Sequence, residues 1–209
     1  MFRSLATLAF TAGTVLLVAA LTLLGRAPGS PLRVRHLREM KDRLAEPREV
    51  ARFSLDDMGA LPRRLAVAEY SAYEARGVVM EGWMQGMLLA GDGDVHLELV
   101  TRDPGPHGRV STYATGEITP LWRRGAPAWS YDSLVAAFRP FRGGRTGWDD
   151  GPRRVRLTGW LCYDYQYDFP PSTWALQFGA PRRTGWEMHP VTKIELWSPA
   201  DTAFVELRR

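Results

Sequence analysis

The chain has 209 residues, which is enough for one domain of ordinary size and an N-terminal leader. Hydrophobic residues make up 45% of it and charged residues 24%, which excludes an intrinsically disordered chain. Although the net charge is +4, the residues from Val78 onward include 15 basic and 15 acidic side chains. This balance disfavours nucleic-acid binding, which needs clustered positive charge. The single cysteine, Cys162, excludes an internal disulfide and a cysteine-based zinc site, and we expect it to be a structural thiol.

The first 30 residues form the expected membrane segment. Leu5 to Leu24 contains no charged residue, and about 20 such residues span a bilayer as a helix. Arg3 precedes this stretch, as in a signal peptide or an uncleaved anchor, and the lack of a clear cleavage site favours the anchor. The basic residues that follow would hold the soluble part in the cytoplasm, whereas an N-terminal apolar segment is typical of export. We expect a single-pass membrane protein, with the soluble part placed outside the cytoplasm in preference to inside.

A helical linker is expected over residues 31–75. Pro31 begins a stretch, Leu32 to Ala45, in which Leu37, Met40 and Leu44 form one narrow apolar stripe on an otherwise charged helix. This pattern favours a solvated stalk over a basic helix that contacts anionic lipid. A cap at Ser54 and a short helix over 65–75 follow, and we expect these pieces to pack against the next domain.

From residue 76 the hydrophobic pattern changes to the period of two that is typical of strands. The expected strands are Gly77–Leu89, Val95–Val100, Arg109–Ile118, Arg154–Tyr163 and Val191–Trp197. One helix, capped by Ser130 or Asp132, separates the third strand from the fourth. The order β-β-β-α-β-β predicts a mainly β fold, a small five-stranded OB-like barrel over residues 76–199, followed by a tail over 200–209.

Carboxylates and imidazoles stand at the ends of several predicted strands, where they can converge. The candidate catalytic residues are Asp94, His96, Glu117, Asp164, Glu187 and His189. Four of them, Asp94, His96, Glu117 and His189, have the donor atoms of a divalent-metal site that could activate water for phosphodiester hydrolysis. A structural network is the favoured alternative, because Asp beside glycine is common in turns and each glutamate could pair with an arginine.

Aromatic side chains give a second candidate surface near the long connection after the fourth strand. It would consist of Trp160, Tyr163, Tyr165, Tyr167 and Trp186. Stacking of bases or sugars on such rings is one interpretation, and core packing is the favoured one given the neutral charge of the domain. A nucleic-acid interface would also need a basic face built from Arg139, Arg142, Arg153, Arg154 and Arg156.

Four motifs carry a family resemblance that spans roughly residues 75–197. They are DGDVHL at 92–97, EITP at 117–120, GWLCYD at 159–164 and TGWEMHPVTKIE at 184–195. Together they resemble a set of uncharacterised bacterial proteins, many of which have an N-terminal leader and none of which has an assigned activity. The resemblance implies a single domain and adds to the case for export, but it supplies no catalytic residue. Met188 replaces the isoleucine that is usual in the last motif.

These observations lead to two functional hypotheses. The first is a membrane-associated, non-enzymatic OB-like module that binds a protein, a peptide or a small ligand. The alternative is a metal-dependent hydrolase of the phosphodiester type, which requires the predicted metal ligands to meet within about 5 Å. We predict no organic cofactor, and the oligomeric state is left open.

Overall fold

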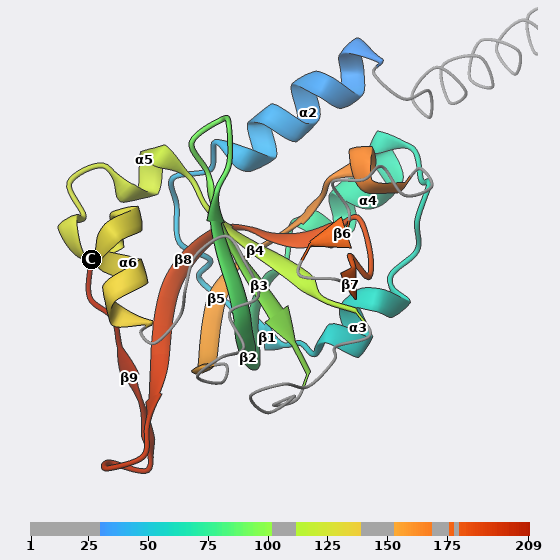
Figure 1. The fold of residues 1–209 in the computed structure, drawn as a ribbon. Helices are drawn as coiled ribbons and strands as arrows, with labels where there is room; N and C mark the ends of the chain where they lie inside the picture. Colours follow the sequence, from blue (N-terminus) through green and yellow to red (C-terminus); the bar gives the residue numbers. More distant parts are fainter. Residues whose placement is uncertain (1–29, 102–111, 139–152, 169–175, 178–179) are drawn as a thin grey trace, which may run out of the picture.

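The computed structural model of the chain describes residues 30–101, 112–138, 153–168, 176–177 and 180–209 (Figure 1). The predicted membrane segment, Leu5 to Leu24, lies outside these residues. In the part of the chain that is described, no helix is both long and apolar enough to cross a membrane.

Among the described residues, five strands close into a barrel. They are β2 (Gly77–Leu89), β3 (Val95–Val100), β4 (Ala114–Ile118), β5 (Arg153–Tyr163) and β8 (Trp186–Ser198). The neighbours run β2-β3-β4-β8-β5, and β5 pairs with β2 to close the ring; β4 and β8 are parallel, while the other pairs are antiparallel. This mixed barrel has the strand order of an OB fold, so the predicted fold class is confirmed at that level.

Helices and short strands connect the barrel strands. They are α5 (Pro120–Arg123), the 3₁₀ turn η1 (Pro127–Trp129), α6 (Tyr131–Ala137), the 3₁₀ turn η2 (Tyr165–Asp168), β6 (Leu176–Gln177) and β7 (Ala180–Pro181). Helix α6 begins after Ser130, whose hydroxyl accepts a hydrogen bond from the backbone N–H of Ser133 at 3.2 Å. The helix therefore starts at the cap that the sequence predicts.

The last barrel strand is longer than predicted. Strand β8 begins at Trp186, five residues before the predicted start at Val191. The sequence did not reveal these residues as a strand, because Glu187, His189 and Pro190 interrupt the apolar pattern that marks one. Residues 109–111 of the predicted third strand lie outside the described residues, and β4 is described from Ala114.

The barrel core is apolar and rich in methionine. Its fully buried strand residues include Val78, Met80, Met84, Met87, Leu97, Leu99, Leu157, Met188, Val191 and Ile194. The register of strand β2 against β3 shifts between Met84 and Gly86, which is an irregularity of the β-bulge kind. Strands β5 and β8 approach so closely at Gly159 that an added Cβ would lie 2.4 Å from the carbonyl oxygen of Pro190.

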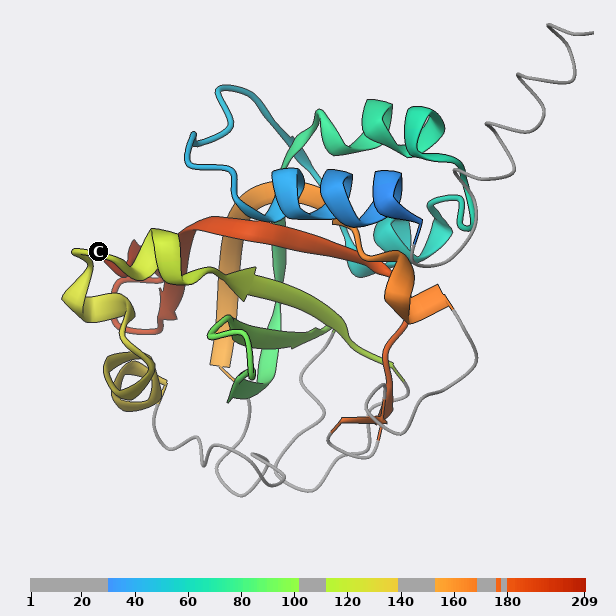
Figure 2. The same cartoon turned by 90° about the horizontal axis from the view of Figure 1, so that it is seen from above.

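The segment before the barrel packs against it. This segment contains α2 (Pro31–Lys41), β1 (Val50–Arg52), α3 (Leu55–Ala60) and α4 (Val67–Glu74). Helix α2 buries Arg33 and Leu37, and Figure 2 shows it lying over β8 beside α4. The helix is therefore no solvated stalk, because Leu37 is buried in the core and Met40 packs against it, although Leu44, the third residue of the predicted stripe, is exposed. Strand β1 adds to the sheet in parallel with β2.

The end of the chain also belongs to the sheet. The predicted tail over 200–209 contains strand β9 (Ala203–Glu206), which pairs with β8 in a hairpin. The rings of Trp197 and Phe204 meet edge to face across this hairpin, with centroids 5.2 Å apart. The backbone N–H of Leu207 also donates to the carbonyl of Ile194. These contacts hold a strand of four residues, which is too short to predict from its own sequence.

Candidate metal centre

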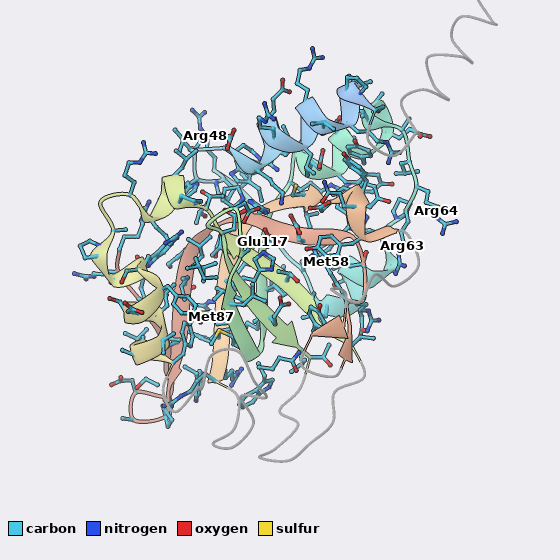
Figure 3. The ribbon with its side chains drawn as sticks, turned by 45° about the horizontal axis from the view of Figure 1, so that its top comes forward. Arg48, Met58, Arg63, Arg64, Met87 and Glu117 are labelled. Carbon is cyan, nitrogen blue, oxygen red and sulfur yellow. The ribbon has the colours of Figure 1, made fainter. Side chains whose placement is uncertain are left out.

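The polar motif residues gather on one face of the barrel wall, opposite the apolar core. His96 of β3 pairs with Glu117 of β4 in the antiparallel register, and β4 lies beside the segment of β8 that contains Glu187 and His189. Cross-strand partners point to the same side of a sheet. The register therefore brings together side chains from three strands, and Figure 3 shows Glu117 near the middle of its view, below α2.

His189 occupies the middle of this cluster and is completely buried. Its Nδ1 lies 2.9 Å from an oxygen of Glu187, with which it hydrogen-bonds, and 2.9 Å from Oε2 of Glu117. Its Nε2 lies 3.6 Å from Oδ2 of Asp94. In the described part of the molecule, neither Nε2 nor the two Glu117 oxygens have a hydrogen-bond partner. Buried polar atoms without partners are costly, so these atoms are available to bind a water or an ion.

His96 lies on the other side of Glu117. Its Nε2 is 3.5 Å from Oε1 of Glu117, and its Nδ1 is 3.7 Å from Oε1 of Glu98. The second oxygen of Glu98 accepts a hydrogen bond of 2.8 Å from the hydroxyl of Thr115. The Glu117 carboxylate therefore faces an imidazole on each side.

Two permanent cations reach the cluster from outside the three strands. Nζ of Lys41, at the end of α2, lies 3.3 Å from Asp164, 3.7 Å from Glu117 and 4.0 Å from Glu187. The guanidinium of Arg182 donates to Glu187 and stacks on the ring of Tyr167, 3.5 Å from its centroid. Both cations hold carboxylates that would otherwise repel one another.

The described cluster has more negative than positive groups. Its five carboxylates, Asp94, Glu98, Glu117, Asp164 and Glu187, face two permanent cations, Lys41 and Arg182. Burial alone would lower the pKa of His189, but the Glu117 and Glu187 carboxylates together outweigh it and raise this pKa to about 9. The pKa of His96 is raised in the same way, against its own burial. Without a bound cation, protons on the two imidazoles supply the missing positive charge.

Two of the acids around His189, Asp94 and Glu117, have pKa values that shift in opposite directions. Burial raises the pKa of Asp94 to about 6. Burial would also raise the pKa of Glu117, but His189 and His96 hold it well below its ordinary value. Glu117 is therefore an anion at neutral pH, and Asp94 loses its proton as the pH rises through about 6.

A cleft of about 710 Å³ connects the cluster with solvent. It opens between α2 and the loops that follow β4 and β5. Its polar lining includes Arg38, Lys41, Asp42, Asp92, Asp94, Thr119, Asp164 and Gln166, and its apolar lining includes Val34, Leu37, Pro120 and Leu121. Four of these residues are acidic and two are basic, so the lining is negative. A cation can reach Asp94 through this opening.

The structure brings all six predicted candidates, Asp94, His96, Glu117, Asp164, Glu187 and His189, into one connected network. Sequence reasoning missed Lys41, Arg182 and Glu98. Glu98 could have been found, because it stands two residues after His96 on the same strand face. Lys41 could not, because its helix was expected to be solvated.

The predicted aromatic surface is not a surface. Trp186 and Tyr163 are buried, with ring centroids 4.8 Å apart, and the Trp186 indole donates to the carbonyl of Pro62. Tyr165 is buried beside Arg33, and the half-buried Trp160 donates to the carbonyl of Ala45. Tyr167 is half-buried on Arg182. Residues 31–75 cover these rings, so the buried Tyr163, Tyr165 and Trp186 agree with the favoured interpretation, core packing, and not with an exposed binding surface.

Two further predictions concern arginine and cysteine. Arg139 and Arg142 of the hypothetical basic face lie outside the described residues, and Arg153 is exposed. Arg154 and Arg156 form ion pairs with Glu81. The pairing of these two arginines leaves less free positive charge for phosphates.

Cys162 is buried, and burial raises the pKa of its thiol well above the ordinary value, as expected of a structural cysteine.

Comparison with known proteins gives only distant likenesses. No family model matches the chain, and no curated protein matches it. Among solved structures, the chain is similar to an asparaginyl-tRNA synthetase from Entamoeba histolytica in complex with asparaginyl-adenylate. The identity is 18% and the TM-score 0.38, over 73% of this chain and 25% of the synthetase, so the chain spans a quarter of that protein. An OBody bound to hen egg-white lysozyme is 14% identical with a TM-score of 0.31, over 60% of this chain and 84% of the OBody.

Proposed function

We propose that the domain binds a divalent transition-metal ion between Asp94, Glu117 and His189, with His96 beside them. One ligand atom from each of the first three residues lies within 4.8 Å of the other two. The observation that carries the proposal is the buried Nε2 of His189, which has no hydrogen-bond partner among the described residues and faces Asp94. Imidazole with carboxylates suits zinc, manganese or iron better than calcium, which prefers oxygen ligands alone.

The position of the cluster supports the same proposal. It lies on the face of the second and third barrel strands, β3 and β4, where OB folds commonly bind their ligands. The negative lining of the cleft favours the entry of a cation. A metal ion would replace the protons on the imidazoles as the source of positive charge, so binding should release protons.

The size of the cleft favours a second candidate function, metal-dependent hydrolysis. A volume of about 710 Å³ exceeds what a hydrated ion requires and leaves room for an organic substrate. A metal ion at Asp94 would lie at the inner end of this cleft, where it could lower the pKa of a bound water. A phosphodiester is the substrate class that we test first. Membrane anchoring through Leu5 to Leu24 stays a prediction.

Calorimetric titration of the metal-free full-length protein in detergent tests the binding proposal. We expect Zn²⁺ or Mn²⁺ to bind with proton release, and Ca²⁺ to bind more weakly. His189→Ala should weaken binding at least about 100-fold, since losing even a supporting group of a metal ligand costs about 10–100-fold. His36→Ala is the matched control, because His36 also pairs with a buried glutamate, Glu74, but outside the cluster. Equal affinity in the two variants would refute the site.

Hydrolysis is tested separately with bis(p-nitrophenyl) phosphate and the metal that binds most tightly. The hydrolase function predicts turnover that disappears in Asp94→Asn and persists in His36→Ala. If the metal binds and no turnover is found with this or other phosphodiesters, the centre serves binding alone.

A further inference from the structure

Three carboxylates surround the ammonium of Lys41 at the edge of the same cleft. Glu117 comes from β4, Glu187 from β8, and Asp164 from the residue that follows β5. Their nearest oxygens lie 3.3–4.0 Å from Nζ, longer than most ammonium–carboxylate hydrogen bonds. The three side chains are almost fully buried. Carboxylate oxygens therefore surround the ammonium, and it is bound mainly by charge attraction.

We propose that Lys41 occupies a second cation subsite, which adjoins the proposed metal centre through Glu117, and that a divalent ion binds there when the ammonium is removed. The proposal rests on the proposed function only for the presence of the first ion. All three carboxylates offer oxygen, which suits Mn²⁺ or Mg²⁺.

Glu117 has the position of a bridging ligand. Its Oε1 faces His96, while its Oε2 faces both His189 and Lys41. Neither oxygen has a hydrogen-bond donor among the described residues, although the side chain is only 1% exposed. In two-metal sites a shared ligand holds ions about 3.5–4 Å apart. Here a lysine supplies the second positive charge from within the chain.

Helix α2 is anchored by contacts that do not involve Lys41. The hydroxyl of Ser30 caps its first turn, Leu37 is buried in the core, and the guanidinium of Arg33 donates to the carbonyl of Leu65. Replacing Lys41 should therefore change the charge of the subsite and leave the helix in place.

The test counts Mn²⁺ ions per full-length chain after equilibrium dialysis, in the wild type, Lys41→Met and Lys41→Gln. We expect both variants to bind one ion more than the wild type, with spin coupling between the two ions in the electron paramagnetic resonance spectrum. Lys41→Arg keeps the charge and should bind the wild-type number. Arg38→Met is the matched control, because Arg38 lines the same cleft one turn earlier on α2, and it should also bind the wild-type number. Circular dichroism checks that each variant is folded.

The double variant His189→Ala/Lys41→Met separates this proposal from the proposed function. It should bind one ion at the carboxylate subsite at an Mn²⁺ concentration at which His189→Ala alone, with its weakened site, stays empty. If the wild type binds no metal and Lys41→Met binds one, the proposed function fails and the subsite stands. If neither Lys41→Met nor Lys41→Gln gains an ion over the wild type, and the double variant gains none over His189→Ala, the subsite is refuted whatever the wild type binds.

Discussion

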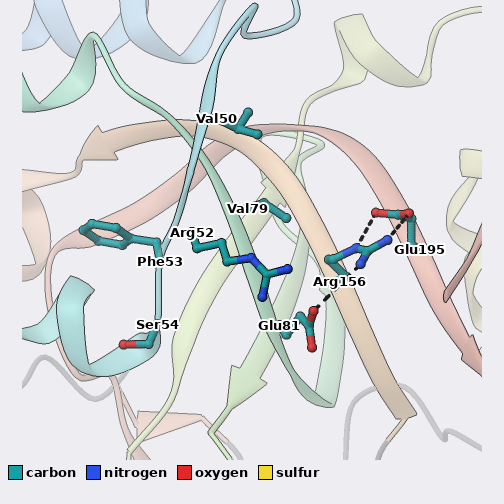
Figure 4. Close-up of a pocket in the computed structure, with 8 residues that line it drawn as sticks. All are labelled: Val50, Arg52, Phe53, Ser54, Val79, Glu81, Arg156 and Glu195. Atoms are coloured by element: carbon teal, nitrogen blue, oxygen red, sulfur yellow. Dashed lines mark hydrogen bonds and ion pairs between the residues drawn. The ribbon is translucent and has the colours of Figure 1, made fainter. Parts of the chain in front are cut away.

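Two regions of the molecule are built from the same kinds of charged residue and have opposite properties. One is the cluster around His189, and the other is a groove of about 440 Å³ lined by β1, β2, β5 and β8 (Figure 4). In the groove, Arg156 donates two hydrogen bonds to Glu195, of 2.8 and 2.6 Å, and lies 3.8 Å from Glu81. Each of these carboxylates has an arginine partner, and the arginine side chains stay partly exposed.

The comparison shows that charged residues alone do not make a binding site. In the groove, the hydrogen bond from Arg156 lowers the pKa of Glu195, so the ionised form of the pair is the stable one. In the cluster around His189, the described carboxylates outnumber the permanent cations, and Glu117 has no hydrogen-bond donor among the residues that the structure describes. The groove is electrostatically complete, whereas the cluster requires protons or a metal ion.

The largest difference should appear when a carboxylate is neutralised in each region. We expect Glu187→Gln to destabilise the fold by about 3–5 kcal/mol, because it leaves the buried guanidinium of Arg182 without its hydrogen-bonded anion. The matched change in the groove, Glu195→Gln, should cost about 1 kcal/mol or less, since Arg156 can turn to solvent. Urea unfolding of the two variants measures both values, and equal costs would contradict the distinction between the regions.

The next effect is a loss of stability at alkaline pH, which arises from His189 in the cluster and not from the groove. The pKa of His189 is about 9 in the folded protein and about 6.5 in an unfolded chain, so its protonation stabilises the fold fully below pH 6.5. This contribution, roughly 3 kcal/mol, is lost as the pH rises through 9. Asp94 acts in the same direction at lower pH, because its raised pKa of about 6 also favours the protonated form.

Metal-free protein in a chelating buffer should therefore melt at a lower temperature at pH 9.5 than at pH 6.5. His189→Gln should lose most of this slope, and His36→Ala should keep it. A saturating metal ion should also flatten the slope, because the metal replaces the proton on His189. The same slope in wild type and His189→Gln would show that another group is responsible.

The fold and the centre of the site follow from patterns that are local in the sequence. The strand order could be predicted because period-two stretches and glycine turns lie within short windows, and His96, Glu117 and His189 stand at strand positions that the register brings together. The role of Lys41 depends on packing between residues that are 76 positions apart, Lys41 and Glu117, which no local pattern records. Strand β9 depends on its pairing with β8 in the same way.

The smallest expected effect is the coupling energy between Arg156 and Glu195 in the groove. A double-mutant cycle of Arg156→Met and Glu195→Gln should give a coupling energy below about 1 kcal/mol, and added salt should reduce it further. Arg156→Met alone should cost slightly more than this coupling, because Arg156 also lies 4.5 Å from the ring centroid of Phe204 and supports the β8–β9 hairpin. A coupling energy above about 2 kcal/mol that resists salt would show that the groove pair is as desolvated as the inner cluster, and the contrast between the two regions would then rest on hydrogen bonding alone.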